Sequence, residues 1–167
     1  FDEIRKTTET HPQIIPIDLA QLEDSEAKTI AEVIRTKYGR LDGILHNASM
    51  LGPRLPIASY PFADWNEVMQ VNAIAPFKLT HMLLPLLNEA PDASIIFTSS
   101  GVGRVGRACW GAYASSKFAI EGLSQTLADE LKEAGRIRVN ALNPGATRTA
   151  MRAAAYPNED PNTLPKP

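Results

Sequence analysis

Tyr113 and Lys117, four residues apart, have side chains of the types needed for proton transfer. On a helix, positions i and i+4 share a face, so the ammonium group can lie near the phenol. A nearby positive charge favours the phenolate and would bring the tyrosine pKa down from about 10 towards neutrality. The pair predicts a general acid with a group that tunes it, although the same spacing, taken alone, is more often that of an ordinary surface pair.

Ser100 stands thirteen residues before Tyr113, directly after a short apolar run. A hydroxyl at the end of a strand could donate a hydrogen bond to a substrate carbonyl and stabilise the charge that develops there. The other interpretation is that Ser99 and Ser100 only cap backbone groups at the strand end. Ser100 together with Tyr113 favours an active site.

Asn72 interrupts an otherwise apolar helical stripe, and a buried amide needs hydrogen-bond partners. Pro76 follows four residues later and has no N–H to donate to the Asn72 carbonyl, so a helix through both residues should kink. The free carbonyl could hold a water molecule. The alternative is a solvent-facing kink without function.

Apolar patterns predict strands and helices that alternate along the chain. The predicted order is a buried strand from Gln13 to Leu19, a helix from Ala27 to Tyr38 that ends at Gly39, a strand from Leu41 to Leu45, a helix from Asp64 to Leu87, a strand from Ser94 to Thr98, a helix from Tyr113 to Ala134, a strand from Ile137 to Leu142 and a Pro-rich loop from Pro157 to Pro167. Such alternation indicates an α/β fold, with a parallel sheet covered by helices on both faces.

Polar residues follow the predicted strands. Asp18, Asn47, Ser100 and Asn143 stand at four strand ends. The carboxyl ends of parallel strands meet at one edge of a sheet, and open α/β sheets bind ligands there. We therefore expect the active site along this edge.

The stretch from Gly101 to Gly106 matches the Gly-x-Gly-x-x-Gly pattern of dinucleotide-phosphate loops. No helix is expected directly at its third glycine, and no strand with an acidic end follows about 20 residues later. We interpret the stretch as a flexible wall of the active site.

Composition excludes several classes of protein. The chain has 167 residues, 44% of them hydrophobic, and a formal net charge of −2 without long runs of either sign, which argues against nucleic-acid and membrane partners. His11, His46 and His81 form no metal-like pair, so no metal is expected. The single Cys109 excludes an intrachain disulfide framework and favours the reducing cytoplasm.

Taken together, Asn72, Ser100, Tyr113 and Lys117 resemble the catalytic tetrad of the short-chain dehydrogenase/reductase family. Shorter motifs agree with it. Asp18-Leu19 looks like the family's adenine-contacting turn, Asn47-Ala48 with Ser49 like its Asn-Asn-Ala-Gly turn, and Pro144-Gly145 with Thr147 and Thr149 like its nicotinamide contact.

The resemblance implies an oxidoreductase that moves a hydride between a nicotinamide and a carbonyl or alcohol. Tyr113 would exchange the proton, Ser100 would orient the substrate oxygen, Lys117 would bind the nicotinamide ribose, and the Asn72 carbonyl would hold a relay water. The cofactor would be NADP(H) or NAD(H); a closer likeness to bacterial members of undefined substrate favours NADP(H). A non-catalytic dinucleotide-binding protein of the same fold is the alternative.

The resemblance also implies a small-molecule carbonyl or alcohol substrate. Arg104, Arg107, Trp110 and the segment after Thr149 are expected to line its pocket. Family members usually pair through the helices predicted here at 64–87 and 113–134, so a homodimer or homotetramer is expected.

Two departures from the family stand out. His46 and Ser49 replace the Asn and Gly that flank the core of the family turn. The opening strand and glycine loop of the family do not appear, which leaves a gap in the expected strand order 3-2-1-4-5-6. We therefore predict one Rossmann-like doubly wound domain over residues 1–167, taken from the interior of a longer chain and incomplete at both ends.

Overall fold

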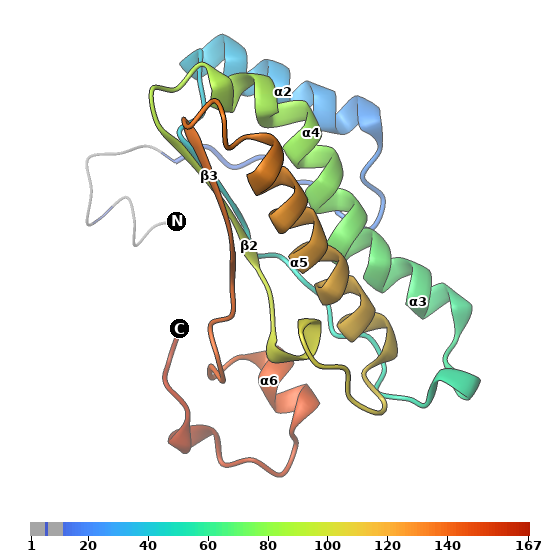
Figure 1. Cartoon of the computed structure of the whole chain (residues 1–167). Coiled ribbons are helices and arrows are strands. Elements are labelled where there is room, and N and C mark those ends of the chain that lie inside the picture. Colours follow the sequence, from blue (N-terminus) through green and yellow to red (C-terminus); the bar gives the residue numbers. More distant parts are fainter. Residues whose placement is uncertain (1–5, 7–11) are drawn as a thin grey trace.

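The computed structural model describes residue 6 and residues 12–167 (Figure 1). His11 lies outside them. Three parallel strands form its sheet in the order β1 (Gly43–His46), β2 (Ala93–Thr98) and β3 (Ile137–Leu142). β1 begins two residues later than predicted because the Leu41 N–H donates to the Leu86 carbonyl, 3.0 Å away, at the end of a helix. The predicted α/β class and parallel sheet are confirmed.

Three long helices pack along one face of the sheet (Figure 1): α2 (Asp24–Tyr38), α4 (Ala75–Asn88) and α5 (Gly111–Glu130). Apolar residues of α4 and α5 meet the buried side chains of β2, among them Ile95 and Phe97, in the main core. Helix α2 packs mainly against α4 in separate apolar clusters. The second helical layer of a doubly wound sheet is not among the described residues. Leu45 and Leu142 are accordingly 62% and 51% exposed.

The predicted strand from Gln13 to Leu19 is wrong for the described chain. Residues 12–18 belong to no strand, and Ile14 is 51% exposed. A strand needs a neighbour to pair its backbone N–H and carbonyl groups, and no strand of the described residues lies beside this segment.

The long helix predicted from Asp64 to Leu87 contains a change of winding. It consists of α3 (Phe62–Met69), a π-helical turn η2 (Gln70–Ile74) and α4, so that the Ala75 N–H donates to the Gln70 carbonyl five residues back. Pro76 cannot make the ordinary bond to residue 72, and a π turn accommodates that loss. The disturbance predicted between Asn72 and Pro76 is confirmed.

The remaining elements are short. They are the 3₁₀ turns η1 (Ile57–Ser59), η3 (Gly101–Gly103) and η4 (Pro161–Thr163), and helix α6 (Ala150–Ala155). The end of the chain is loop apart from η4, as predicted. Within the described residues, no helix is long and apolar enough to cross a membrane.

Candidate active site

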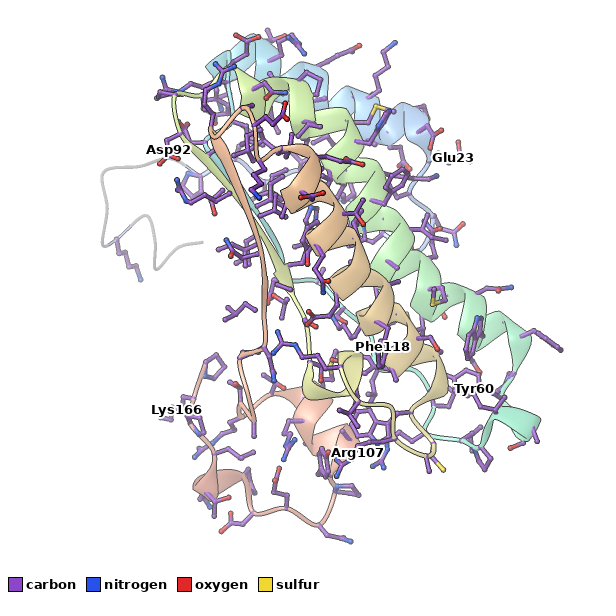
Figure 2. The ribbon with its side chains drawn as sticks, in the orientation of Figure 1. Glu23, Tyr60, Asp92, Arg107, Phe118 and Lys166 are labelled. Atoms are coloured by element: carbon purple, nitrogen blue, oxygen red, sulfur yellow. The ribbon has the colours of Figure 1, made fainter. Side chains whose placement is uncertain are left out.

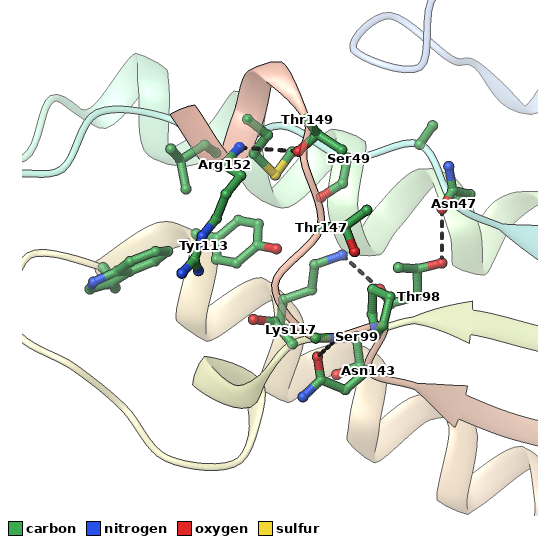
Figure 3. A pocket seen from close by; sticks show the side chains of 17 residues that line it. Asn47, Ser49, Thr98, Ser99, Tyr113, Lys117, Asn143, Thr147, Thr149 and Arg152 are labelled. Atoms are coloured by element: carbon green, nitrogen blue, oxygen red, sulfur yellow. Dashed lines mark hydrogen bonds between the residues drawn. The ribbon is translucent and has the colours of Figure 1, made fainter. Parts of the chain in front are cut away.

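A cavity of about 410 Å³ opens at the carboxyl ends of the three strands (Figure 3). The register places Phe97 beside His46 and Ala141, so the turns that follow the three strands meet at this edge. Most of the residues predicted from the sequence line the cavity. They are Asn47, Ala48, Ser49, Ser100, Trp110, Tyr113, Lys117, Pro144, Gly145, Thr147 and Thr149.

Lys117 is held by the backbone beneath the cavity. Its side chain is 3% exposed, and its Nζ donates to the Thr98 carbonyl at 2.7 Å. Burial lowers the pKa of Lys117 to about 8, because the ammonium has lost most of its water. Gly103 packs on the stem of Lys117, where an added Cβ would lie 2.8 Å from the lysine Cβ. Only a glycine lets η3 approach α5 so closely.

Tyr113 reaches into the same space from the preceding turn of α5 (Figure 3). Burial raises the pKa of Tyr113, and a hydrogen bond to the Ser100 side chain opposes that rise. The depressed tyrosine pKa expected from the sequence is not seen, because Lys117 donates to Thr98 and its Nζ lies 5.5 Å from the centre of the tyrosine ring. Tyr113 is therefore a neutral phenol at neutral pH and suits the role of proton donor.

Asn72 lies behind the cavity and is 2% exposed. Its Oδ1 accepts from the Met50 N–H at 2.8 Å and from the Ser49 hydroxyl at 3.1 Å. Its Nδ2 donates to the Met50 carbonyl at 2.8 Å and to the Ser116 hydroxyl at 3.0 Å. That hydroxyl in turn donates to the Tyr113 carbonyl at 2.8 Å. Asn72 thus joins the turn after β1 to the helix that carries Tyr113.

His46, one of the departures from the family turn, is a packed side chain. Its ring stacks on Phe97 with centroids 4.9 Å apart, and its Nε2 lies 2.8 Å from the Thr80 hydroxyl. Burial lowers the pKa of His46 to about 4, so the ring is neutral. The next residue, Asn47, accepts a hydrogen bond from the Thr98 hydroxyl at 3.2 Å. These contacts fix the turn on one wall of the cavity.

Besides Asn72, four predicted residues do not line this cavity. Asp18 forms a local turn, accepting from the Ala20 N–H at 2.9 Å, and Leu19 lines a neighbouring hollow that also touches Asn47 and Ala48. Arg104 pairs with Glu121, 3.1 Å away on α5. Arg107 lines a second cavity, which adjoins the first at Ser100.

Several residues of the site were not singled out from the sequence. Thr98 supplies the carbonyl that holds Lys117, and Ser116 ties Asn72 to α5. Ser116 lies three residues after Tyr113, and this helical spacing was a usable signal. Arg152 and Tyr156 lie beyond Thr149, and only the segment as a whole was predicted to line the pocket. The described residues contain no cluster of metal-ligating side chains.

The chain resembles known proteins along nearly all its length. It is 51% identical to the uncharacterized oxidoreductase YciK of Escherichia coli K12 over 98% of this chain and 64% of that protein. It is 35% identical to the 3-oxoacyl-acyl-carrier-protein reductase FabG of Thermotoga maritima, over 90% of this chain and 61% of that one. The chain thus spans less than two thirds of the length of these curated relatives.

Solved structures agree with the sequence comparisons. A short-chain dehydrogenase from Pseudomonas syringae superposes with a TM-score of 0.96 at 52% identity, covering 99% of this chain and 67% of that one. A short-chain dehydrogenase from Shigella flexneri, complexed with NADP, superposes with a TM-score of 0.95 at 49% identity. That match covers 99% of this chain and 68% of the other. The sequence profile of the short-chain dehydrogenases matches residues 1–160. The chain therefore belongs to the short-chain dehydrogenase/reductase family.

Proposed function

We propose that the protein is an NADP(H)-dependent oxidoreductase that interconverts a carbonyl compound and its alcohol. The observation that carries this proposal is the meeting of Ser100, Tyr113 and Lys117 on one cavity, together with the turns that follow all three strands. A buried phenol beside a hydroxyl and an ammonium group can protonate and orient a carbonyl oxygen. We further propose that residues 1–167 belong to a single dinucleotide-binding domain.

The cavity fits a ligand that carries hydroxyl and amide groups. The Ser99 hydroxyl is buried there without a hydrogen-bond partner among the described residues, and Lys117 uses one of its three donors on Thr98. The residues that would hold the nicotinamide half are Asn47, Ala48, Ser49, Tyr113, Lys117, Pro144, Gly145, Thr147 and Thr149, with Asp18 and Leu19 towards the adenine. When bound, the cofactor supplies or accepts a hydride at the carbonyl carbon. The similar protein from Shigella flexneri is complexed with NADP, and one from Escherichia coli CFT073 with NADPH, which supports the choice of NADP(H).

The side chains divide the remaining work. Tyr113, kept as a neutral phenol by burial, gives its proton to the substrate oxygen, and the Ser100 hydroxyl donates a hydrogen bond to the same oxygen. Lys117 places a positive charge beneath the site and donates to ribose hydroxyls. Asn72 keeps the turn after β1 aligned with α5. Its carbonyl, which Pro76 cannot reach, holds the water that returns a proton to the tyrosine.

The substrate is a small molecule that enters from the side of Trp110 and Arg107, with Arg104 at the outer end of the same loop. The adjoining second cavity supports this direction of entry, because it touches Ser100, Trp110 and Arg107 together. A protonated Tyr113 is the form that can give a proton to a carbonyl oxygen, so carbonyl reduction is the reaction to assay at neutral pH.

A homodimer or homotetramer in the cytoplasm completes the proposal. The two helical segments expected to pair carry exposed apolar side chains, with Phe77 52% and Phe118 46% exposed (Figure 2). Light scattering on the purified protein tests the assembly. A monomer at micromolar concentration would contradict it.

Titration of the purified protein with NADPH and NADH, followed by nicotinamide fluorescence, tests the function. We expect saturable binding of NADPH, weaker binding of NADH, and NADPH oxidation with at least one member of an aldehyde and ketone panel. Binding without any turnover would favour the non-catalytic alternative. If neither nucleotide binds, the oxidoreductase assignment fails.

A further inference from the structure

The second cavity, of about 390 Å³, lies against the proposed catalytic serine. Ser100, Trp110, Asn143, Gly145 and Arg152 border both this cavity and the first one. Because it adjoins the first cavity at Ser100, it is the space open to the part of a substrate that lies beyond the carbonyl group.

One wall of the second cavity is aromatic. The rings of Trp110 and Tyr156 have centroids 5.8 Å apart, and Trp110 lies at the same distance from the ring of Tyr113. These rings belong to one packed cluster in which Trp110 is 7% exposed. The wall is therefore apolar and firmly held, and a flat or apolar substrate fits against it.

Three guanidinium groups surround this aromatic wall. Arg152 lies over the Tyr156 ring at 3.8 Å, and Arg54 lies over Trp110 at 4.6 Å. Arg107 donates to the Tyr156 hydroxyl at 3.0 Å and lies in the loop that leads into α5, facing α6 (Figure 2). A guanidinium group that stacks on an aromatic ring keeps the N–H donors in its own plane free to bind an anion.

The positive charge here exceeds the negative charge. The Nε and Nη2 of Arg152 donate to the Glu159 carboxylate at 2.6 Å each, and its Nη1 donates to none of the described residues. Arg54 donates to the Ala155 carbonyl, which is neutral. Among the described residues, no carboxylate pairs with Arg107 or Arg54. By contrast, Arg104, in the same loop as Arg107, is neutralised by Glu121.

We propose that the substrate is a carbonyl compound that also carries a carboxylate, which Arg107 binds with Arg152 beside it. This rests on the proposed reductase function and adds the chemical class of its substrate. Arg107 has a planar fork of donors of which one is used, and a carboxylate accepts such a fork through two parallel hydrogen bonds. The aromatic wall then contacts the body of the substrate while its carbonyl lies at Ser100 and Tyr113.

Binding of an unreactive anion tests this proposal without any turnover. The NADP⁺ complex of the purified protein is titrated calorimetrically with benzoate and with benzamide, which has the same shape without the charge. We expect benzoate to bind at least about tenfold more tightly, in line with the strength of charge-assisted hydrogen bonds. Equal affinities, or no binding of benzoate, would overturn the proposal.

Variants locate the site. Arg107→Gln should weaken benzoate binding about tenfold and leave benzamide unchanged, while Arg107→Lys should retain part of the affinity. The matched control is Arg138→Gln, because Arg138 pairs with Asp92 at the opposite end of the molecule from Arg107 (Figure 2). Loss of benzoate affinity in the control, or none in Arg107→Gln, would place the anion elsewhere and refute the assignment.

Turnover separates this proposal from the reductase assignment. The value of kcat/KM for 4-carboxybenzaldehyde should exceed that for its methyl ester, and Arg107→Gln should remove the difference. If the ester is reduced equally well in a reaction that depends on Tyr113, the reductase assignment is supported and the proposal of a carboxylate-bearing substrate is refuted. If benzoate binds as expected but neither aldehyde is reduced, the failure belongs to the reductase assignment.

Discussion

The two sides of the cavity differ in how their polar groups are held. On the cofactor side, Asn72 makes four hydrogen bonds and Lys117 is fixed to a backbone carbonyl, with both side chains almost fully buried. On the proposed substrate side, Arg54 and Arg107 extend from loops, Arg152 extends from the short helix α6, and Arg107 is exposed. The first side is rigid before any ligand arrives. On the second side, Arg54 and Arg107 pair with no carboxylate of the described residues, so their positive charge is available to a ligand.

The proposed catalytic groups therefore lie on the firmly held side of the cavity, and the groups proposed to select the substrate lie on the other side. Groups that must meet a reacting atom with little freedom come from strand ends and from α5, whose positions the core determines. The groups proposed to bind the rest of the substrate come from the loop before α5 and from the segment around α6, and such segments can vary without disturbing the core. Substitutions on the two sides should therefore act on different measured quantities.

Among substitutions that leave Tyr113 in place, Ser100→Ala should have the largest effect, on the kcat of carbonyl reduction. Loss of the donor to the substrate oxygen should lower kcat about 100-fold to 1,000-fold. The affinity for NADPH and the melting temperature should stay near their wild-type values, because Ser100 lies at the cavity and not in the core. A variant that turns over normally would mean that Ser100 only caps the end of β2.

A comparison of wild type with Lys117→Met tests the cost of burying the ammonium. The folded pKa is about 8, below the ordinary 10.5, so between these values the unfolded chain holds a proton that the folded chain has released. The free energy of unfolding of the wild type, relative to the variant, should therefore rise by about 3 kcal/mol from pH 8 to 10.5. Denaturant titrations at several pH values measure this difference. A difference that stays constant with pH would show that Lys117 titrates normally.

Asn72→Ala should lower the free energy of unfolding by about 2 to 3 kcal/mol, because it removes a buried side chain with four hydrogen bonds and takes away the partner of the partly buried N–H and carbonyl of Met50. Urea denaturation measures this, with Asn66→Ala on the exposed face of α3 as the matched control. We expect the control to change stability by less than about 0.5 kcal/mol. Equal effects of the two substitutions would contradict the bridging role assigned to Asn72.

His46→Asn should remove an acid sensitivity on the cofactor side. The folded pKa of His46 is about 4, below the ordinary 6.5. As the pH falls from 6.5 to 4, His46 becomes protonated in the unfolded chain but stays neutral in the folded one. The free energy of unfolding therefore decreases. Relative to the variant, the wild type should lose about 3 kcal/mol over this interval, which chemical denaturation can measure. Parallel curves for the two proteins would mean that the ring is protonated in the folded state.

The cofactor side was predictable from the sequence because its signals are local. Tyr113 and Lys117 lie one turn apart on α5, as their spacing predicted, and the interval from Asn72 to Pro76 predicted a disturbed helix, though not that the disturbance would be a π turn. Tertiary effects were not predictable. Burial in the folded protein raises the pKa of Tyr113, and Lys117 donates to Thr98, 19 residues away in the sequence; neither effect can be read from the spacing of Tyr113 and Lys117.

The substrate side was predicted less completely for the same reason. Arg104 and Arg107 look alike in the sequence, and only the position of Glu121 on α5 distinguishes the paired arginine from the free one. Tyr156 and Glu159 come from a loop without periodicity, so nothing local marked them. The segment from Gln13 to Leu19 reads as a strand because it is apolar, but pairing depends on a neighbour that its own residues do not encode.

The central claim is that the phenol of Tyr113 protonates a carbonyl substrate in this cavity. The most direct test compares wild type with Tyr113→Phe in NADPH binding and in single-turnover NADPH oxidation with the best aldehyde of the panel. We predict that the variant binds NADPH with near wild-type affinity and loses about a thousandfold in rate. A variant that oxidises NADPH at the wild-type rate would contradict the account, because the proton would then come from another group.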